Sequence, residues 1–96
     1  MAKVYIAGKI TGLENYKELF KRAEVDLRIK GHVCMHSSVL GKGFEWDEYM
    51  KICFTMITVC DVVYMLKNWR DSQGARIEHA YAIKHNKKII YQVDSE

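Results

Sequence analysis

A carboxylate that could act as a nucleophile, Glu78, follows a short apolar run and a polar loop in the second half of the chain. The run Val62–Leu66 is rich in β-branched and aromatic residues without clean alternation, which predicts a strand buried on both faces. The loop Lys67–Gln73 follows, and a helix is expected from Gly74 to about His85. Ligands of open α/β sheets bind at the carboxyl ends of the strands, where a helix N-terminus favours negative charge. Glu78, about one turn into this helix, is therefore expected to stay ionised and to be available as a nucleophile or base.

A simpler interpretation of Glu78 is an acidic residue on a solvated helix face, and its position alone favours that interpretation. Two neighbours argue for a site instead. Trp69 in the loop and Arg76 on the helix would suit a flat ring that carries an anionic group. Either Asp71 or Ser72 could cap the helix that carries the carboxylate.

The expected first strand, Val4–Ala7, leads into a loop bracketed by two glycines, Gly8-Lys9-Ile10-Thr11-Gly12. Glycines at this spacing let backbone N–H groups approach a ligand or let the chain turn tightly. A plain turn is the simpler interpretation of this loop in isolation. Gly8, Lys9 and Gly12 are its candidate ligand-contacting residues.

Two further helices are expected from apolar residues at helical spacing. The first starts after Asn15, which with Glu18 resembles a capping box, and ends at Gly31 as a C′ residue. The second, from about Glu45 to Val59, is apolar on more than one face. We expect one of its faces to cover the sheet and another to contact a second copy of the chain.

The remaining segments complete an alternating pattern of strands and helices. Strands are expected at His32–Met35 and Lys88–Tyr91, and His36–Gly43 is expected to be a surface loop rather than a lid. With right-handed crossovers, the order β-α-β-α-β-α-β predicts a flavodoxin-like α/β fold. It would be a three-layer sandwich with a four-stranded parallel sheet of order 2-1-3-4, and residues 1–96 would form a single domain.

This topology makes the first and third strands neighbours. The loop Gly8–Gly12 and the segment Trp69–Glu78 would then face each other across one crevice at the switch point of the sheet. That convergence is the strongest physical argument for a ligand site at this edge.

Composition excludes several other classes. The chain has 96 residues, 49% of them hydrophobic, and no proline, which is typical of a folded domain. The net charge of +3 comes with scattered lysines and does not indicate specific nucleic-acid binding. No apolar run approaches the roughly 18 residues of a membrane span, and the N-terminal apolar run is too short for a signal peptide. The three cysteines and four histidines lack metal-ligand spacing, so we expect free thiols in the cytoplasm, no metal and no cofactor.

Three strings of residues together resemble a known family. They are Val4-Tyr5-Ile6-Ala7-Gly8 with Gly12, then Cys60-Asp61, and then Trp69-x-Asp71-Ser72-x-Gly74-Ala75-Arg76-x-Glu78. With these strings the chain resembles the nucleoside 2-deoxyribosyltransferase superfamily over nearly its whole length. It looks most like a group of short, mostly phage or prophage proteins within that superfamily, and the last string is the most diagnostic of the three.

The resemblance implies a flavodoxin-like fold, an oligomer, and cleavage of the N-glycosidic bond of 2′-deoxynucleosides or their 5′-monophosphates. Glu78 matches the family's nucleophile, and Tyr5 matches the tyrosine that orients it. In the nucleotide-hydrolysing relatives, the first glycine loop and a serine before the catalytic helix hold the 5′-phosphate. The matching residues here are Gly8, Gly12, Ser72 and Gly74. A phosphate-binding role for Arg76 is our own inference from its charge.

Three departures from the family pattern concern the leaving group and a loop. Cys53 stands where the transferases have an aspartate that handles the leaving base, and a buried thiol is a poor general acid. Ser72 stands about where they have an acidic residue. The segment His36-Ser37-Ser38 stands where many short relatives have Asn-Pro.

Two functions of different class remain open. One is a deoxyribosyltransferase or nucleotide N-glycosidase with Glu78 as nucleophile. The other is a non-catalytic module that binds or sequesters a nucleotide-like ligand, and a structural oligomer with a vestigial pocket is a third, simpler hypothesis. The base, the sugar and the number of phosphates stay open. Phe44, Trp46 and Tyr49 could be contributed to a neighbouring subunit's pocket, although core packing explains the last two more simply.

Overall fold

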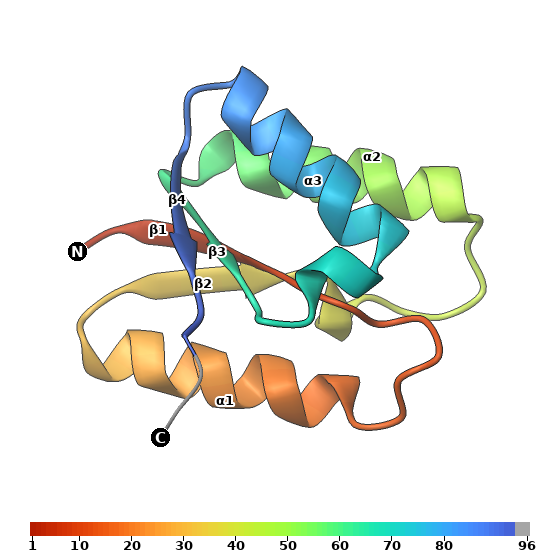
Figure 1. Cartoon of the computed structure of the whole chain (residues 1–96), viewed down its shortest axis with the longest axis horizontal. Helices are drawn as coiled ribbons and strands as arrows, with labels where there is room; N and C mark the ends of the chain where they lie inside the picture. The colour runs from red at the N-terminus through yellow and green to blue at the C-terminus, as the bar shows by residue number, and fades with distance from the viewer. Residues whose placement is uncertain (94–96) are drawn as a thin grey trace.

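The computed structural model describes residues 1–93, in which four strands alternate with three helices (Figure 1). The elements in chain order are β1 (Lys3–Ala7), α1 (Tyr16–Ile29), β2 (Val33–His36), α2 (Trp46–Val59), β3 (Val62–Met65), α3 (Gln73–Lys84) and β4 (Lys88–Tyr91). Two short 3-10 turns, η1 (Ser37–Val39) and η2 (Trp69–Asp71), follow β2 and β3. These bounds lie within one or two residues of those expected from the sequence.

The four strands form one parallel sheet of order β2-β1-β3-β4. The predicted flavodoxin-like topology is therefore confirmed. In the register of the sheet, Tyr5 of β1 lies opposite Met35 of β2 and Val63 of β3. β1 and β3 occupy the centre, so the loops that leave their carboxyl ends are neighbours.

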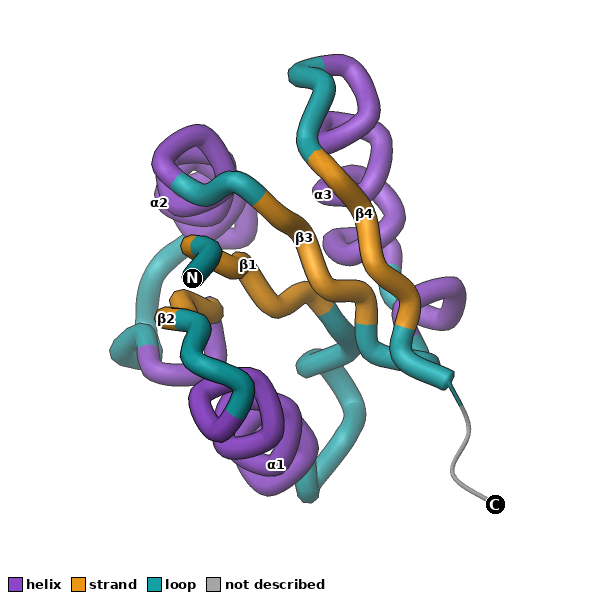
Figure 2. The backbone as a smooth tube through the Cα atoms, turned by 90° about the vertical axis from the view of Figure 1, so that its left-hand side faces the viewer, coloured by secondary structure: helices purple, strands orange, loops and turns teal. Residues whose placement is uncertain are grey.

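Helices cover both faces of the sheet (Figure 2). On the α1 side, Val4 and Ile6 of β1 pack with Phe20 and Leu27 of the helix. On the other side, Tyr5 packs with residues of α2 and α3. Val4 to Ala7 of β1 thus point alternately to opposite faces and are all buried, which explains why this strand shows no alternation of apolar and polar residues.

Of the two ends of α1, the C-terminal end has the predicted cap and the N-terminal end does not. Gly31 has φ +91°, and the N–H groups of Gly31 and His32 donate to the carbonyls of Arg28 and Leu27, which is a Schellman C-terminus. At the start of α1, Asn15 makes no side-chain capping bond, so the expected capping box is wrong. Its intended partner Glu18 forms an ion pair with Arg22 instead.

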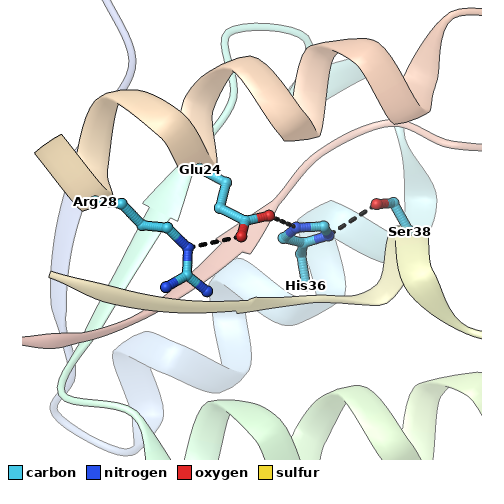
Figure 3. Close-up of polar contacts among 4 residues, drawn as sticks. All are labelled: Glu24, Arg28, His36 and Ser38. Atoms are coloured by element: carbon cyan, nitrogen blue, oxygen red, sulfur yellow. Dashed lines mark hydrogen bonds and ion pairs between the residues drawn. The ribbon is translucent and has the colours of Figure 1, made fainter.

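A polar chain on the α1 side holds the end of β2 (Figure 3). His36, only 6% exposed, bonds Glu24 at 2.9 Å through Nε2 and Ser38 at 2.7 Å through Nδ1. Arg28 donates to the other oxygen of Glu24 at 2.7 Å. The bonds from His36 and Arg28 lower the pKa of the Glu24 carboxyl. His36 belongs to β2, so the expectation that it begins a surface loop is wrong: the start of that segment is buried and bonded.

We predict that His36→Ala lowers the free energy of unfolding by about 2–3 kcal/mol, because it opens a cavity and removes the buried partner of both Glu24 and Ser38. Urea denaturation measures the loss. His85→Ala, at an exposed position after α3, is the control and should change stability by no more than about 0.5 kcal/mol. Equal losses in the two variants would show that the polar chain does not stabilise the fold.

Candidate active site

A cavity of about 300 Å³ lies at the carboxyl end of the sheet. Five stretches of the chain form its walls: the loop after β1, the start of α1, the turn η1 with the residues that follow it, the first two turns of α2, and the start of α3. In Figure 1 these stretches gather on the right-hand side of the molecule. They are far apart in sequence, and the parallel topology brings them to one place.

Glu78 lines this cavity from α3, and its residue is only 5% exposed. Tyr5, fully buried in β1, donates its hydroxyl to Glu78 Oε2 at 2.9 Å. The interpretation of Glu78 as an acid on a solvated face is therefore wrong. The bond joins the central strand to the helix that follows β3, and it orients the carboxyl within the wall of the cavity.

Burial sets the charge state of this pair. Desolvation raises the pKa of Glu78 to about 7, although hydrogen bonding to Tyr5 and Cys53 acts in the opposite direction. The expectation that the helix terminus keeps this group fully ionised is wrong, because Glu78 is the sixth residue of α3 and the dipole acts mainly within the first turn. Burial, and then the charge of Glu78, raise the pKa of Tyr5 well above its usual value. Tyr5 thus remains a hydrogen-bond donor.

Cys53 of α2 lies in the same cavity wall and is 3% exposed. Burial and the negative charge of Glu78 raise the pKa of its thiol to about 12. A thiol with this pKa is neither a thiolate nucleophile nor an efficient proton donor near neutral pH.

Five of the residues singled out in the sequence come together here. Gly8, Ser72, Gly74 and Glu78 line the cavity, and Tyr5 lies directly behind Glu78. Ser72, rather than Asp71, caps α3 by accepting a bond from Ala75 N at 3.1 Å.

The two glycines of the cavity differ in how much space surrounds them. A Cβ at Gly8 would lie 2.5 Å from Leu66 Cδ1 and 3.0 Å from its Cβ. A Cβ at Gly74 would meet nothing closer than Met50 Sδ at 3.7 Å, an ordinary contact. Only Gly8 therefore owes its identity to close packing, here of the β1 loop against the end of β3.

Lys9 and Gly12 lie outside the cavity wall. The backbone N–H of Lys9 donates to Asn68 Oδ1 at 3.0 Å and so ties the loop after β1 to the loop after β3. Gly12 is exposed with φ +78°, so the simpler interpretation of that position, a tight turn, holds.

Trp69 and Arg76 are also outside the wall, contrary to the expectation that they flank a ligand. Trp69 is 8% exposed and stacks on His79 at 4.3 Å, with the Arg70 guanidinium 4.7 Å from its ring centre. Arg76 donates through Nη1 to the carbonyl of Arg70 at 2.6 Å. A large aromatic residue in a short loop packs into the core here, and the arginine secures that loop.

Several wall residues were not singled out as site residues from the sequence. They include Tyr16 of α1, Ser37 of η1, and Leu40 and Lys42 in the loop that follows. The predicted topology could have indicated the residues after the second strand, because parallel strands end at the same edge of a sheet and this segment must start there as well.

The chain shares its fold with a solved structure, and its sequence matches a known family. Among solved structures, the chain is similar to "2-desoxiribosyltransferase from Leishmania mexicana", with a TM-score of 0.75 and 18% identity. The match covers 95% of this chain and 63% of the other, so this chain spans less than two thirds of that protein, and the likeness establishes a shared fold. The chain belongs to the family described as "Domain of unknown function (DUF4406)", which matches residues 2–91. No curated protein matches the chain.

Two features are absent from residues 1–93. Within this part of the chain, no group of three or more His, Cys, Asp and Glu side chains could hold a metal ion. No helix there is both long enough and apolar enough to cross a membrane.

The raised pKa of Glu78 predicts a pH-dependent stability. The native pKa of about 7 exceeds the ordinary value of 4.5, so the unfolded chain releases this proton first and stability falls as pH rises toward 7. Between pH 5 and 8 the loss attributable to Glu78 should be about 2–3 kcal/mol. Glu78→Gln keeps an acceptor for Tyr5 and should remove this loss, so that the variant is more stable than the wild type at pH 8.

Urea unfolding at the two pH values measures the effect. Glu14→Gln, which removes an exposed carboxylate from the loop after β1, is the matched control and should keep the pH dependence of the wild type. An unchanged pH dependence in Glu78→Gln would show that Glu78 titrates normally.

Proposed function

We propose that the cavity binds a 2′-deoxynucleoside or its 5′-monophosphate and cleaves or transfers its N-glycosidic bond, with Glu78 as nucleophile. The observation that carries this proposal is a buried carboxyl, oriented by Tyr5, in the wall of a cavity large enough for a nucleoside. The likeness in fold to a protein named as a 2-desoxiribosyltransferase supports it.

The reaction uses the two oxygens of Glu78 differently. Tyr5 bonds Oε2, so we assign Oε1 to the attack on the anomeric carbon of the sugar. A bond forms between Oε1 and this carbon, the N-glycosidic bond breaks, and its electron pair leaves with the base. Water or a second base then attacks the same carbon and releases the carboxylate. Two inversions give overall retention of configuration, as in retaining glycosidases.

The proposed reaction lacks an efficient acid at Cys53 to protonate the leaving base. The Cys53 thiol, with a pKa of about 12, contributes little as an acid. This observation favours the alternative function, a module that binds a nucleotide derivative without turning it over. Turnover would be fastest for bases that leave without protonation.

We predict that base release rises with pH through about 7, because the nucleophile must be ionised. Glu78→Gln should lower the rate at least ~1,000-fold. Tyr5→Phe removes a donor that stabilises the carboxylate, so it should shift the apparent pKa upward and lower the rate most strongly below pH 7. Chromatography of free base from a panel of deoxynucleosides and their monophosphates measures these rates.

The control for Tyr5→Phe is Tyr64→Phe, on the central strand β3 but packed on the α1 side. Full turnover in Glu78→Gln would remove the nucleophile assignment. A sharp rise in melting temperature with nucleotides, without base release over hours in the wild type, would establish the binding module instead.

We also propose that residues 1–96 form one domain, that this domain acts in the cytoplasm, and that it belongs to the short phage-type group.

We further propose that α2 mediates self-association. Ile52 and Val59 lie two turns apart on α2 and are 40% and 52% exposed. Val59 also lines a groove of about 270 Å³ with Val33 and Met35 of the edge strand β2. A second copy that packs α2 against this surface would cover these apolar side chains.

Ile52→Glu should therefore lower the solution mass measured by light scattering at micromolar concentration to that of a single chain. Ile29→Glu, on the exposed side of α1 across the sheet, should leave the mass unchanged. A wild-type mass equal to one chain would contradict self-association.

A further inference from the structure

The cavity wall contains two residues with formal charge, Lys42 and Glu78. They come from different segments: Lys42 from the loop between η1 and α2, and Glu78 from α3. Among residues 1–93, none of the salt bridges involves Lys42. Its ammonium group is therefore available to a ligand.

The loop that carries Lys42 is tied to α2 by a single phenol. The Tyr49 hydroxyl donates to the carbonyl of Gly41 at 2.6 Å and accepts from the N–H of Phe44 at 3.3 Å. The rings of Phe44 and Tyr49 also meet edge to face at 6.0 Å. Gly43 has φ +102°, a conformation that other residues adopt only with strain. These contacts fix both ends of the short segment around Lys42.

The other cations near this edge of the sheet lie outside the cavity wall. Arg76 bonds the Arg70 carbonyl, Arg70 lies over the Trp69 ring, and Lys9 is outside the cavity wall. An anionic ligand group in the cavity thus meets one lysine. The same anionic group would be repelled from the end of the cavity that contains Glu78, because that carboxyl becomes negatively charged above pH 7.

We propose that Lys42 is the specificity-determining residue of this pocket and selects ligands that carry a phosphate monoester, the 5′-phosphate of a nucleotide, over uncharged nucleosides. This inference rests on the proposed function and names the substrate class within it. The phosphate pairs with the Lys42 ammonium, and the sugar then lies between that group and Glu78. Tyr49 is a positioning residue, because it holds the loop on which Lys42 stands.

The test measures binding by calorimetry in the Glu78→Gln background, which blocks turnover. The probes are the common 2′-deoxynucleosides and their 5′-monophosphates, each at low and at physiological salt. At least one monophosphate should bind about tenfold or more tightly than its nucleoside, since a hydrogen bond to a charged group contributes on that scale. Lys42→Met should abolish this preference and its salt dependence, so that the monophosphate binds no more tightly than its nucleoside.

Two more variants separate Lys42 from general effects of charge. Lys51→Met removes an exposed lysine from α2 outside the cavity wall and should keep the preference. Tyr49→Phe should lower the preference, because it frees the loop but keeps the ring. Arg76→Met should behave like the Lys51 control.

An unchanged preference in Lys42→Met, its loss in Arg76→Met instead, or no monophosphate binding at millimolar concentration would each overturn the inference. These outcomes are distinct from failure of the proposed function. Glu78-dependent turnover without a Lys42 effect leaves the glycosidase and removes the selection of phosphate. A Lys42-dependent preference without turnover leaves the phosphate site and removes the glycosidase.

Discussion

The hydrogen bond between the Tyr5 hydroxyl and Glu78 is the interaction on which the architecture of the pocket depends. A carboxyl group that is 5% exposed would be costly to ionise without a partner. Tyr5 supplies a donor whose own pKa is too high for it to lose its proton. The pair therefore keeps a carboxyl in the core with a pKa of about 7, near the value that suits proton-dependent chemistry at neutral pH.

Parallel topology explains why this pair opens onto a cavity. β1 and β3 lie side by side, so the loops after them meet, and the Lys9–Asn68 bond joins those loops directly. The end of β2 arrives at the same edge, where the chain of bonds from Arg28 through Glu24 and His36 to Ser38 secures it from the opposite face. Ser37, between two of these bonded residues, lines the cavity.

Much of this arrangement could be predicted from the sequence, because buried parallel strands and amphipathic helices leave a pattern that follows from burial alone. Gly31 was identifiable as a helix end because glycine is favoured where φ is positive. The neighbourhood of Glu78 was identifiable from the order of the elements. The direction of individual side chains was not: Trp69 could equally have faced a ligand or the core, and His79, its stacking partner, lies on the next helix.

Charge states and loop positions could not be predicted from the sequence, because both depend on tertiary packing. The pKa of Glu78 depends on the depth of burial, which only tertiary packing sets. Lys42 lies in a polar glycine-rich segment that is typical of a surface loop, and the bonds from Tyr49 that fix it are contacts between the loop and a helix. Nor could the sequence show that Arg76 lies outside the cavity wall, where its guanidinium bonds the backbone carbonyl of Arg70.

The proposed role of Glu78 as nucleophile can be checked by mass spectrometry of the acid-quenched protein after incubation with 2′-deoxynucleosides and their 5′-monophosphates. We expect a deoxyribosyl or deoxyribosyl-phosphate adduct on the peptide that contains Glu78, and no such adduct in Glu78→Gln. Base release with the adduct on a different peptide, or base release that continues undiminished in Glu78→Gln, would contradict it.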